Sequence, residues 1–498
     1  MKSFPVRRLP GCIVHLAISL ERSAVACALF AILLVGFTHN ASAQRKQPER
    51  SIPNLYSNFC SACHGINMGG GQTEGFLDDT WNVGNDDAKI AEAIRVGNTN
   101  KGMIAFGGAL SEAEIRGMVV YIRETIQKAK NQTGNFAKPV DGEVVASQDH
   151  KFRFKMVASG LTMPWSMAFL PDGRMLVAER SGSLRVIEQG KLLTNAIVGT
   201  PQVRAQGQGG LMEVVPHPGF ATNGWIYLSF SDGGSNAMGA DVSMTAIVRG
   251  RIRDGKWVDE QTIFRAPIDT YLSTSHHFGN RIVFDGLGYL FFSIGDRGQM
   301  ENAQDITLPN GKIHRLHEDG RIPVDNPFVK TNRAFASIWS FGQRNPQGLA
   351  IHPVTGELWE TEHGPRGGDE LNLIRPGLNF GWPVICYGIN YNGLPITEGL
   401  TAKEGMEQPI IHWTPSIAVC GIDFYTGSRF PKWKTNLFVT GLASQELRRL
   451  VIEGHAVKHQ EIVFKNVGRI RDVANGPDGY LYVVMNGPDQ IVRLEPTE

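Results

Sequence analysis

The sequence predicts a multidomain protein, in which a small all-α domain precedes an all-β six-bladed propeller. Two stretches on either side of residue 100 carry apolar residues at helical spacing. Beyond residue 150, a turn containing Pro, Gly or Asp precedes a short alternating apolar strand, and this unit recurs six times. The 57 Gly and 26 Pro of the chain also favour short strands joined by tight turns.

Residues 1–43 are predicted to be a signal peptide. Three arginines precede an apolar run from Ala24 to Phe37, and the small residues up to Ala43 are typical of a cleavage site. The run has about 14 residues, which is short for a membrane span. We therefore expect cleavage near Ala43, a periplasmic protein and no stable membrane span. An uncleaved anchor is the alternative.

The stretch "CSACH" predicts a covalently attached c-type haem. Cys60 and Cys63 lie one helical turn apart and can form thioethers with two vinyl groups of the haem. His64 would then bind the iron through Nε2. A zinc half-site or a redox dithiol is the alternative for this cysteine pair, and it agrees less well with export.

Two helices are expected after the haem motif, over residues 85–97 and 110–129. The second opens with Ser111 and Glu114, the pattern of a capping box. Together these features resemble a class I cytochrome c over residues 50–130. Three methionines compete for the sixth iron position; Met103 matches the ligand loop of that family, whereas Met68 is close to His64 and Met118 lies on the apolar helix face.

The predicted boundaries follow from these patterns. We assign residues 44–130 to the cytochrome c domain, the polar and aperiodic residues 131–149 to a linker, and residues 150–498 to the propeller. Two cysteines remain in the last part, and Cys386 and Cys420 are interpreted either as a disulfide or as two buried thiols.

Six turn-and-strand units predict the propeller. Their first turns fall near residues 171, 217, 285, 353, 431 and 477, and these intervals fit one four-stranded blade plus loops of variable length. A propeller closes into a ring around a central channel. Six polar clusters adjoin predicted strand starts, about one per blade, which predicts a shared pocket at the mouth of the channel.

The polar clusters resemble the soluble quinoprotein sugar dehydrogenases, the glucose/sorbosone and aldose sugar dehydrogenase family. The resemblance covers roughly residues 150–495 and rests on stretches such as "HHFGNR", "GQRNPQG", "HGPRGGDE" and "RIRDV" in the order of that family. It implies pyrroloquinoline quinone (PQQ) held with Ca²⁺ at the centre of the propeller. A hard cation would make the quinone electrophilic, and cationic donors would hold its oxygens.

The resemblance also implies a role for individual residues. His277 matches the general base, and Arg344 would hold the charge that develops on the quinone oxygen. Further cofactor contacts are implied for Gln208, Asn345, Tyr391, Arg469 and Arg471. Calcium ligands are implied at Gly364 and Pro365 through main-chain carbonyls, and at Glu370 with the carbonyl of Phe380, while Asp369 would brace the loop.

Two positions depart from the family pattern. His276 stands where the glucose-specific enzyme has an acidic residue that orients the base. Gln445 stands where the family often has a lysine. Trp413 could line the sugar pocket or belong to the core. These departures leave the orientation of His277 and the affinity for the cofactor open.

The expected function is a periplasmic PQQ-dependent aldose dehydrogenase. It would oxidise a C1 hydroxyl to a lactone and pass electrons singly to its own haem, and then to a respiratory acceptor. The alternatives are a calcium-dependent propeller lactonase and a non-catalytic binding propeller. The formal net charge of +1 gives no indication of nucleic-acid binding.

Overall fold

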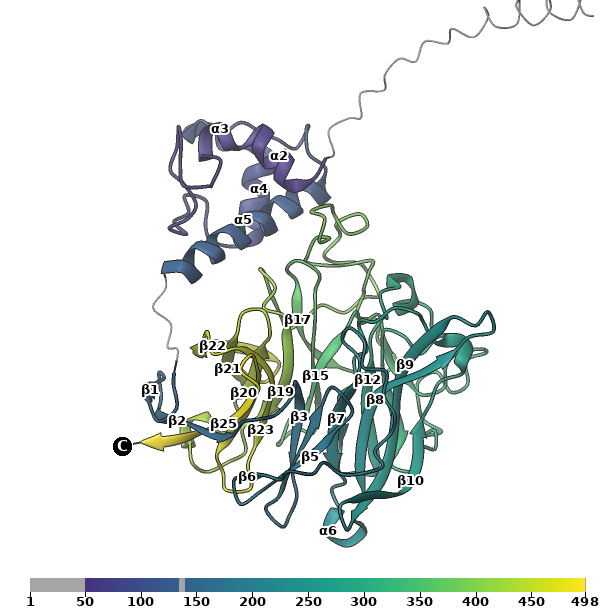
Figure 1. Ribbon diagram of the computed structural model, residues 1–498. Helices are drawn as coiled ribbons and strands as arrows, with labels where there is room; N and C mark the ends of the chain where they lie inside the picture. Colours follow the sequence, from purple (N-terminus) through teal and green to yellow (C-terminus); the bar gives the residue numbers. More distant parts are fainter. Residues whose placement is uncertain (1–49, 134–138, 498) are drawn as a thin grey trace, which may run out of the picture. The chain divides into compact units, whose positions relative to one another are not determined.

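The computed structural model of the 498-residue chain describes residues 50–133 and 139–497. The predicted signal peptide therefore lies outside the described residues. The first part of the described chain is helical (Figure 1). Its elements are α2 (Ile52–Phe59), α3 (Ser61–His64), α4 (Asp87–Val96), the 3₁₀ turn η1 (Thr99–Lys101) and α5 (Glu112–Thr133).

Helix α5 begins at the predicted capping box. The main-chain N–H of Ser111 donates to the Glu114 carboxylate at 2.8 Å, and the Glu114 N–H donates back to the Ser111 hydroxyl at 3.3 Å. Apolar residues of α5 pack against α2 and α4 in one buried cluster, which contains Ile115, Met118 and Ile122. This packing confirms the predicted amphipathic face.

The rest of the described chain is mostly β-strand. Short helical pieces interrupt it at α6 (Phe220–Asn223), η2 (Ile268–Thr270), η3 (Met300–Ala303) and η4 (Pro431–Trp433). The strands are β1 (Val144–Ala146), β2 (Lys151–Ala158), β3 (Pro164–Phe169), β4 (Met175–Glu179), β5 (Leu184–Glu188), β6 (Lys191–Leu192), β7 (Leu211–Pro216), β8 (Ile226–Ser235), β9 (Asp241–Arg253), β10 (Lys256–Phe264), β11 (Ile282–Phe284), β12 (Tyr289–Ile294), β13 (Lys312–His317), β14 (Ile338–Phe341), β15 (Pro346–Ile351), β16 (Leu358–Glu362), β17 (Asp369–Ile374), β18 (Ile411–Trp413), β19 (Val419–Phe424), β20 (Leu437–Gly441), β21 (Glu446–Glu453), β22 (Ala456–Lys465), β23 (Arg469–Asn475), β24 (Leu481–Asn486) and β25 (Gln490–Thr497).

These strands form six antiparallel sheets, which confirms the six-bladed propeller. Blades 1 to 5 are β3–β6, β7–β10, β11–β14, β15–β18 and β19–β22, and blade 6 joins β23, β24 and β25 to β2 and β1. The first strands of neighbouring blades contact one another around a complete ring from β3 to β23 and back to β3. These six strands are therefore the inner strands of the propeller.

Blade 6 closes the ring with strands from both ends of the propeller sequence. Strand β2 pairs with β25, with Phe154 opposite Leu494. Each inner strand is the last strand of its sheet and keeps one unpaired edge, which the closed ring protects at the centre of the propeller. Each repeated turn seen in the sequence lies between the first and second strand of a blade, as between β3 and β4 or between β23 and β24.

Buried apolar clusters fill the spaces between blades. One cluster joins blades 5 and 6 around Trp433, and another joins blades 1 and 2 around Leu228. The described residues from Ser51 onward form one compact unit. Over residues 50–133 and 139–497, no helix is both long and apolar enough to cross a membrane.

Candidate active site

His277 forms a hydrogen-bonded pair with a carboxylate at the inner end of blade 3. Its Nδ1 lies 2.7 Å from Oδ1 of Asp296, which follows strand β12. The indole N–H of Trp382 donates to the other carboxylate oxygen at 2.8 Å, and Gly298 N–H donates to Oδ1 at 2.7 Å. An ionised carboxylate only accepts hydrogen bonds, so Nδ1 carries the proton and Nε2 keeps its lone pair.

The loop that carries His277 is held in an unusual conformation. His277 has φ +55°, a region that residues other than glycine rarely adopt. Its main-chain N–H donates to Oε1 of Gln208 at 2.8 Å. Gly295 lets strand β12 approach closely, because a Cβ there would lie 2.4 Å from the His277 carbonyl oxygen. Neighbouring backbone and Gln208 therefore fix the position of His277.

Burial keeps His277 neutral. Desolvation lowers its pKa to about 4, although the hydrogen bond to Asp296 acts in the opposite direction and the Arg344 charge lowers it further. Burial alone would raise the pKa of Asp296, but its bond to His277 and the charge of Arg344 bring that pKa below the ordinary value. At neutral pH the pair is therefore a neutral imidazole and a carboxylate, as a general base requires.

Arg344 and Asn345 lie at the start of blade 4, beside this pair. Nη1 of Arg344 donates to the carbonyl oxygens of His363 and Gly364 at 3.2 and 3.0 Å. Its buried Nε has no hydrogen-bond partner among the described residues. Asn345 Oδ1 accepts the N–H of Gly279 at 3.1 Å. A buried, unpartnered cationic donor is suited to an oxygen of a bound ligand.

His363, which directly follows β16 of blade 4, contacts blade 5 and lies within electrostatic range of Arg471 in blade 6. Its Nε2 lies 2.6 Å from the carbonyl oxygen of Val419, so Nε2 carries the proton. Burial lowers the pKa of His363 to about 3, and the nearby charges of Arg344, His277 and Arg471 lower it further. The three predicted residues His277, Arg344 and Arg471 therefore all lie within electrostatic range of the half-buried His363 imidazole.

Arg469 and Arg471 lie at the start of β23, where alternation would place them on one face. The pairing of β23 with β24 is irregular between Ile470 and Asp472, which interrupts that alternation. The two guanidinium groups nevertheless remain neighbours: burial lowers the pKa of Arg469, and the charge of Arg471 lowers it further. Two adjacent cations favour a ligand with carboxylates.

Three carboxyl groups lie around one amide at the predicted calcium segment: Glu360 and Glu362 are buried on β16 just before it, and Glu370 is half-buried within it. Nδ2 of Asn372 lies 3.0, 3.4 and 3.3 Å from carboxyl oxygens of Glu360, Glu362 and Glu370. Burial raises the pKa of Glu370 to about 7, and burial also raises the pKa of the other two, with repulsion from neighbouring carboxylates adding to it. Oε1 of Glu360 and Oδ1 of Asn372 are buried and have no partner among the described residues.

A cavity of about 10 Å³ adjoins this group, enough for about one water molecule. Gly364, Glu370 and Phe380, three of the predicted calcium ligands, line it together with Arg344. Clustered oxygen donors whose ionised forms are disfavoured by burial and mutual repulsion fit a hard cation, which would stabilise their negative charge. No three His, Cys, Asp or Glu side chains of the described chain form a metal site by themselves, so main-chain carbonyls would complete the ligand set. Pro365 follows Gly364 in the same loop, and Oδ1 of Asp369 accepts the main-chain N–H of Gly364 at 2.9 Å.

Three other positions lie apart from the His277 group or in the core. Tyr391 is 70% exposed, on the loop between β17 and β18. Trp413 belongs to the core between blades 4 and 5, and its indole N–H donates to Gln460. Gln445 is half-buried at a turn with φ +53°. Cys386 and Cys420 are buried free thiols rather than a disulfide.

The haem motif lies on α2 and α3 with both cysteines free. His64 stacks on Phe76 with ring centroids 4.3 Å apart, and its Nδ1 lies 3.2 Å from the Thr73 hydroxyl. This contact at Nδ1 leaves Nε2 available for iron, so the residues fit a covalently held haem. Met103 is half-buried against the helical core, whereas Met68 and Met118 are within it. Ligation by Met103 stays a prediction.

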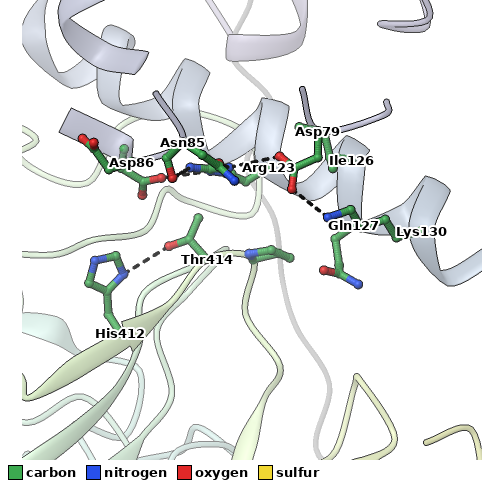
Figure 2. Close-up of a pocket in the computed structure, with 11 residues that line it drawn as sticks. Asp79, Asn85, Asp86, Arg123, Ile126, Gln127, Lys130, His412 and Thr414 are labelled. Atoms are coloured by element: carbon green, nitrogen blue, oxygen red, sulfur yellow. Dashed lines mark hydrogen bonds and ion pairs between the residues drawn. The ribbon is translucent and has the colours of Figure 1, made fainter. Parts of the chain in front are cut away.

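A larger cavity, of about 370 Å³, lies elsewhere (Figure 2). Helix α5 contributes Arg123 and Lys130 to its lining, and the segment after β18 contributes Thr414. Arg123 and Lys130 pair with Asp79 at 3.5 and 2.7 Å. Arg123 also pairs with Asp87 at 3.0 Å, so both cations of the lining are already engaged with carboxylates, and His277 does not line the cavity.

Sequence reasoning missed Asp296 and His363. Asp296 supplies the carboxylate that His276 cannot, so the orientation of the base does not depend on position 276. The only local signal is the position of Asp296 directly after a strand, in "SIGDRG". His363 precedes Gly364 within the motif quoted for calcium, but the sequence does not reveal that Arg344 and Arg471 lie near it.

Comparisons with known proteins identify the family of each domain. The family model for glucose/sorbosone dehydrogenase matches residues 161–493, and the model for cytochrome c oxidase, cbb3-type, subunit III matches residues 47–122. Aldose sugar dehydrogenase YliI of Escherichia coli is 44% identical over 342 residues, which cover 68% of this chain and 91% of that protein.

Solved structures extend the comparison. The soluble aldose sugar dehydrogenase of Escherichia coli, in its apo-form, is 42% identical with a TM-score of 0.65, covering 70% of this chain and 100% of that one. The PQQ-bound aldose sugar dehydrogenase of Streptomyces coelicolor is 27% identical with a TM-score of 0.56, covering 72% of this chain and 100% of that one. The chain therefore belongs to the glucose/sorbosone dehydrogenase family of propeller oxidoreductases, and it carries a cytochrome c domain before the propeller.

Proposed function

We propose that the chain is a PQQ- and Ca²⁺-dependent aldose dehydrogenase that delivers electrons to its own c-type haem. The observation that carries the proposal is the pair of His277 and Asp296 beside Arg344. The imidazole of His363 is within electrostatic range of His277, Arg344 and Arg471, which relates Arg471 to the same site. A neutral, oriented base next to several cations is what oxidation of a sugar hydroxyl by an anionic quinone needs.

His277 would take the proton from the anomeric hydroxyl. Its Nε2 holds the free lone pair because Nδ1–H donates to Asp296. Asp296 then stabilises the imidazolium that forms, as a carboxylate partner does for a catalytic histidine. The aldose becomes a lactone and loses two electrons and two protons in total.

PQQ, when bound, would supply the acceptor for the hydrogen on the anomeric carbon. Arg344 would hold a quinone oxygen through its unpartnered Nε, and Arg469 and Arg471 would hold the cofactor carboxylates. Gln208 and Asn345 position the base and its loop through their main-chain contacts. Ca²⁺ would be held beside Glu370 and the carbonyl of Gly364.

The haem would accept the electrons one at a time. Contacts of helix α5 with the propeller support this transfer. Arg366 of the calcium segment pairs with Glu124 through two hydrogen bonds, and Arg116 donates to the carbonyl oxygen of Tyr387, on the loop between β17 and β18, at 3.0 Å. A haem domain on the same chain replaces a bimolecular encounter with an intramolecular one. An external respiratory carrier would reoxidise the haem. A cleaved signal peptide would place the protein in the periplasm.

Reconstitution tests the proposal. Purified haem-loaded protein is mixed with Ca²⁺, PQQ and glucose or another aldose, and the reduced absorption band of the haem is recorded. We expect the band only when PQQ and an aldose are both present. Haem that stays oxidised with every aldose and PQQ, together with lactone hydrolysis by the same sample, would instead identify a lactonase.

A further inference from the structure

Arg281 extends from blade 3 into the centre of the propeller. It directly precedes the inner strand β11, and its side chain is only 6% exposed. The Nε–H donates to the main-chain carbonyl of Gln347 in blade 4 at 2.8 Å. Nη1 lies 2.7 Å from Glu213 in blade 2 and 2.9 Å from Asp472 in blade 6.

The same guanidinium reaches the two remaining blades. Its central carbon lies 4.7 Å from the ring centroid of Trp165 in blade 1, and Nη2 lies 3.9 Å from Sγ of Cys420 in blade 5. Arg281 therefore contacts an inner strand of each of the other five blades. The planar fork of arginine can serve acceptors in several directions, which a lysine ammonium on a flexible stem cannot reproduce.

Arg281 is also connected directly to Arg471, one of the proposed cofactor ligands. Nη2 of Arg281 donates to the main-chain carbonyl of Arg471 at 2.9 Å. The Arg471 guanidinium lies 5.1 Å from the same Trp165 ring, and its Nη1 lies 3.8 Å from the same Cys420 sulfur. Trp165 and Cys420 thus contact both arginines, of which Arg281 is buried and Arg471 half-buried.

We infer that Arg281 is a positioning residue for the cofactor site: by joining the inner strands of all six blades, it fixes the backbone and side chain of Arg471 for an anionic ligand. This inference rests on the proposed function, because it assigns Arg471 to the cofactor carboxylates. The inference goes beyond the proposed function, because it assigns Arg281 no contact with the cofactor and an effect only through Arg471.

The local charges agree with a positioning role. Burial raises the pKa of Glu213 to about 8, the Arg281 charge lowers it in part, and repulsion from Asp472 raises it again. The one buried cation Arg281 therefore faces two carboxyl groups, Glu213 and Asp472, whose mutual repulsion it offsets. A buried ion pair of this kind contributes little net stability, so its geometric effect on Arg471 is the main consequence.

A substitution at Arg281 tests the inference with a matched control elsewhere in the propeller. Arg449 in blade 5 is equally buried and also bonds two carboxylates, Glu461 and Asp149, but it has no contact with Arg471. The variants Arg281→Lys and Arg449→Lys are compared with the wild type as full-length, haem-loaded proteins. PQQ affinity is measured in the presence of Ca²⁺ by equilibrium dialysis, below the unfolding temperature of each variant.

We expect Arg281→Lys to weaken PQQ binding by about tenfold or more, the effect of losing one or two charge-assisted hydrogen bonds. Turnover at saturating PQQ should stay close to wild type. Arg449→Lys should lower the unfolding temperature and leave PQQ affinity unchanged. Equal PQQ affinity in wild type and Arg281→Lys, or equal weakening by Arg449→Lys, would overturn the inference.

Asp472→Asn decides the question if Arg281→Lys does not fold. Asp472 touches Arg281 at 2.9 Å and accepts the main-chain N–H of Met167 at 3.1 Å, and it is not among the predicted cofactor contacts. Weaker PQQ binding by Asp472→Asn supports the inference, and unchanged binding contradicts it. A wild-type protein that binds no PQQ would show instead that the proposed function is wrong.

Discussion

The haem segment and the propeller site are built in opposite ways. Cys60, Cys63 and His64 lie within five consecutive residues, so one helical turn brings the haem-binding groups together. The propeller site takes Gln208, His277, Arg344 and Arg471 from four different blades. The first is a local arrangement of the chain, whereas the second exists only when the ring has closed.

This difference determines how far the structural effect of a substitution extends through the protein. A change in the haem segment should remain local, because its residues need only α2, α3 and the helical core. A change at the axis of the propeller should reach several cofactor contacts at once, because Arg281 links all six inner strands. The following predictions test this contrast, from the largest expected effect to the smallest.

Removing both haem-attaching cysteines should have the largest and most contained effect. In Cys60→Ser/Cys63→Ser, no thioether can form, so haem should be lost on denaturing electrophoresis with a haem stain. Aldose oxidation with a soluble dye as acceptor should continue at the wild-type rate, because the propeller site is intact. Loss of the dye-coupled activity in a folded protein would show that the two sites are not separable.

Removing the proposed base should strongly slow the oxidation of the aldose in the propeller. We expect His277→Ala to lower kcat for the aldose by about 10²- to 10⁴-fold, the usual contribution of a general base. The haem spectrum should be unchanged. His276→Gln, at the adjacent residue, is the control and should retain most of the activity, since Asp296 rather than residue 276 orients the base. Haem reduction at the wild-type rate in His277→Ala would show that His277 is not the base.

Replacing the carboxylate partner should give a smaller loss. Asp296→Asn keeps the size of the side chain but cannot favour the tautomer with the proton on Nδ1, and we expect kcat to fall about 100-fold. The bond to Asp296 raises the pKa of His277. Its loss should lower that pKa, so the remaining activity of the variant should persist to lower pH than in the wild type. Asp305→Asn, whose carboxylate bonds only Thr307 nearby, should behave like wild type.

The pH dependence of the wild type separates a buried base from an exposed one. Burial lowers the pKa of His277 to about 4, and only the neutral imidazole accepts a proton. Therefore kcat/KM should stay level as the pH falls from neutrality and should decline through about pH 4. A decline centred on the ordinary pKa of histidine would contradict the buried pair. The haem-free propeller activity with a dye is the appropriate measurement.

The smallest predicted effect concerns the helical domain alone. Ser111→Ala removes the hydroxyl that caps α5 and should reduce the stability of this domain by about 1 kcal/mol. Thermal unfolding followed at the haem band measures the change. Thr125→Ala, which removes a hydroxyl within the same helix, should have less effect. A lower unfolding temperature of the propeller in Ser111→Ala would show that the loss of stability is not confined to the helical domain.

Local patterns explain why much of the fold could be predicted. The capping box at Ser111 and the apolar face of α5 are visible within one helix. Each repeated turn marks the first hairpin of a blade, so six turns predict six blades. The pairing of β2 with β25 could not be read in the same way, because it joins segments more than 300 residues apart and no local pattern marks it.

The site was predictable only in part. Motifs identify His277 and Arg344, because each lies within a distinctive short stretch. Asp296 and Arg281 carry no such signal: their roles depend on which atoms the closed ring brings to within 3 Å of them. The alternation of Arg469 and Arg471 predicted a shared face, but the irregular pairing of β23 shows that neighbouring charges can persist without strict alternation.

The central claim is that sugar oxidation and haem reduction occur within one chain. Protein loaded with PQQ, Ca²⁺ and haem is mixed without oxygen with an excess of aldose, and the rate of appearance of the reduced haem band is measured over a range of protein concentrations. An intramolecular transfer predicts a first-order rate that does not change with protein concentration. A rate that rises in proportion to protein concentration, or no haem reduction while the aldose is consumed, would contradict the account.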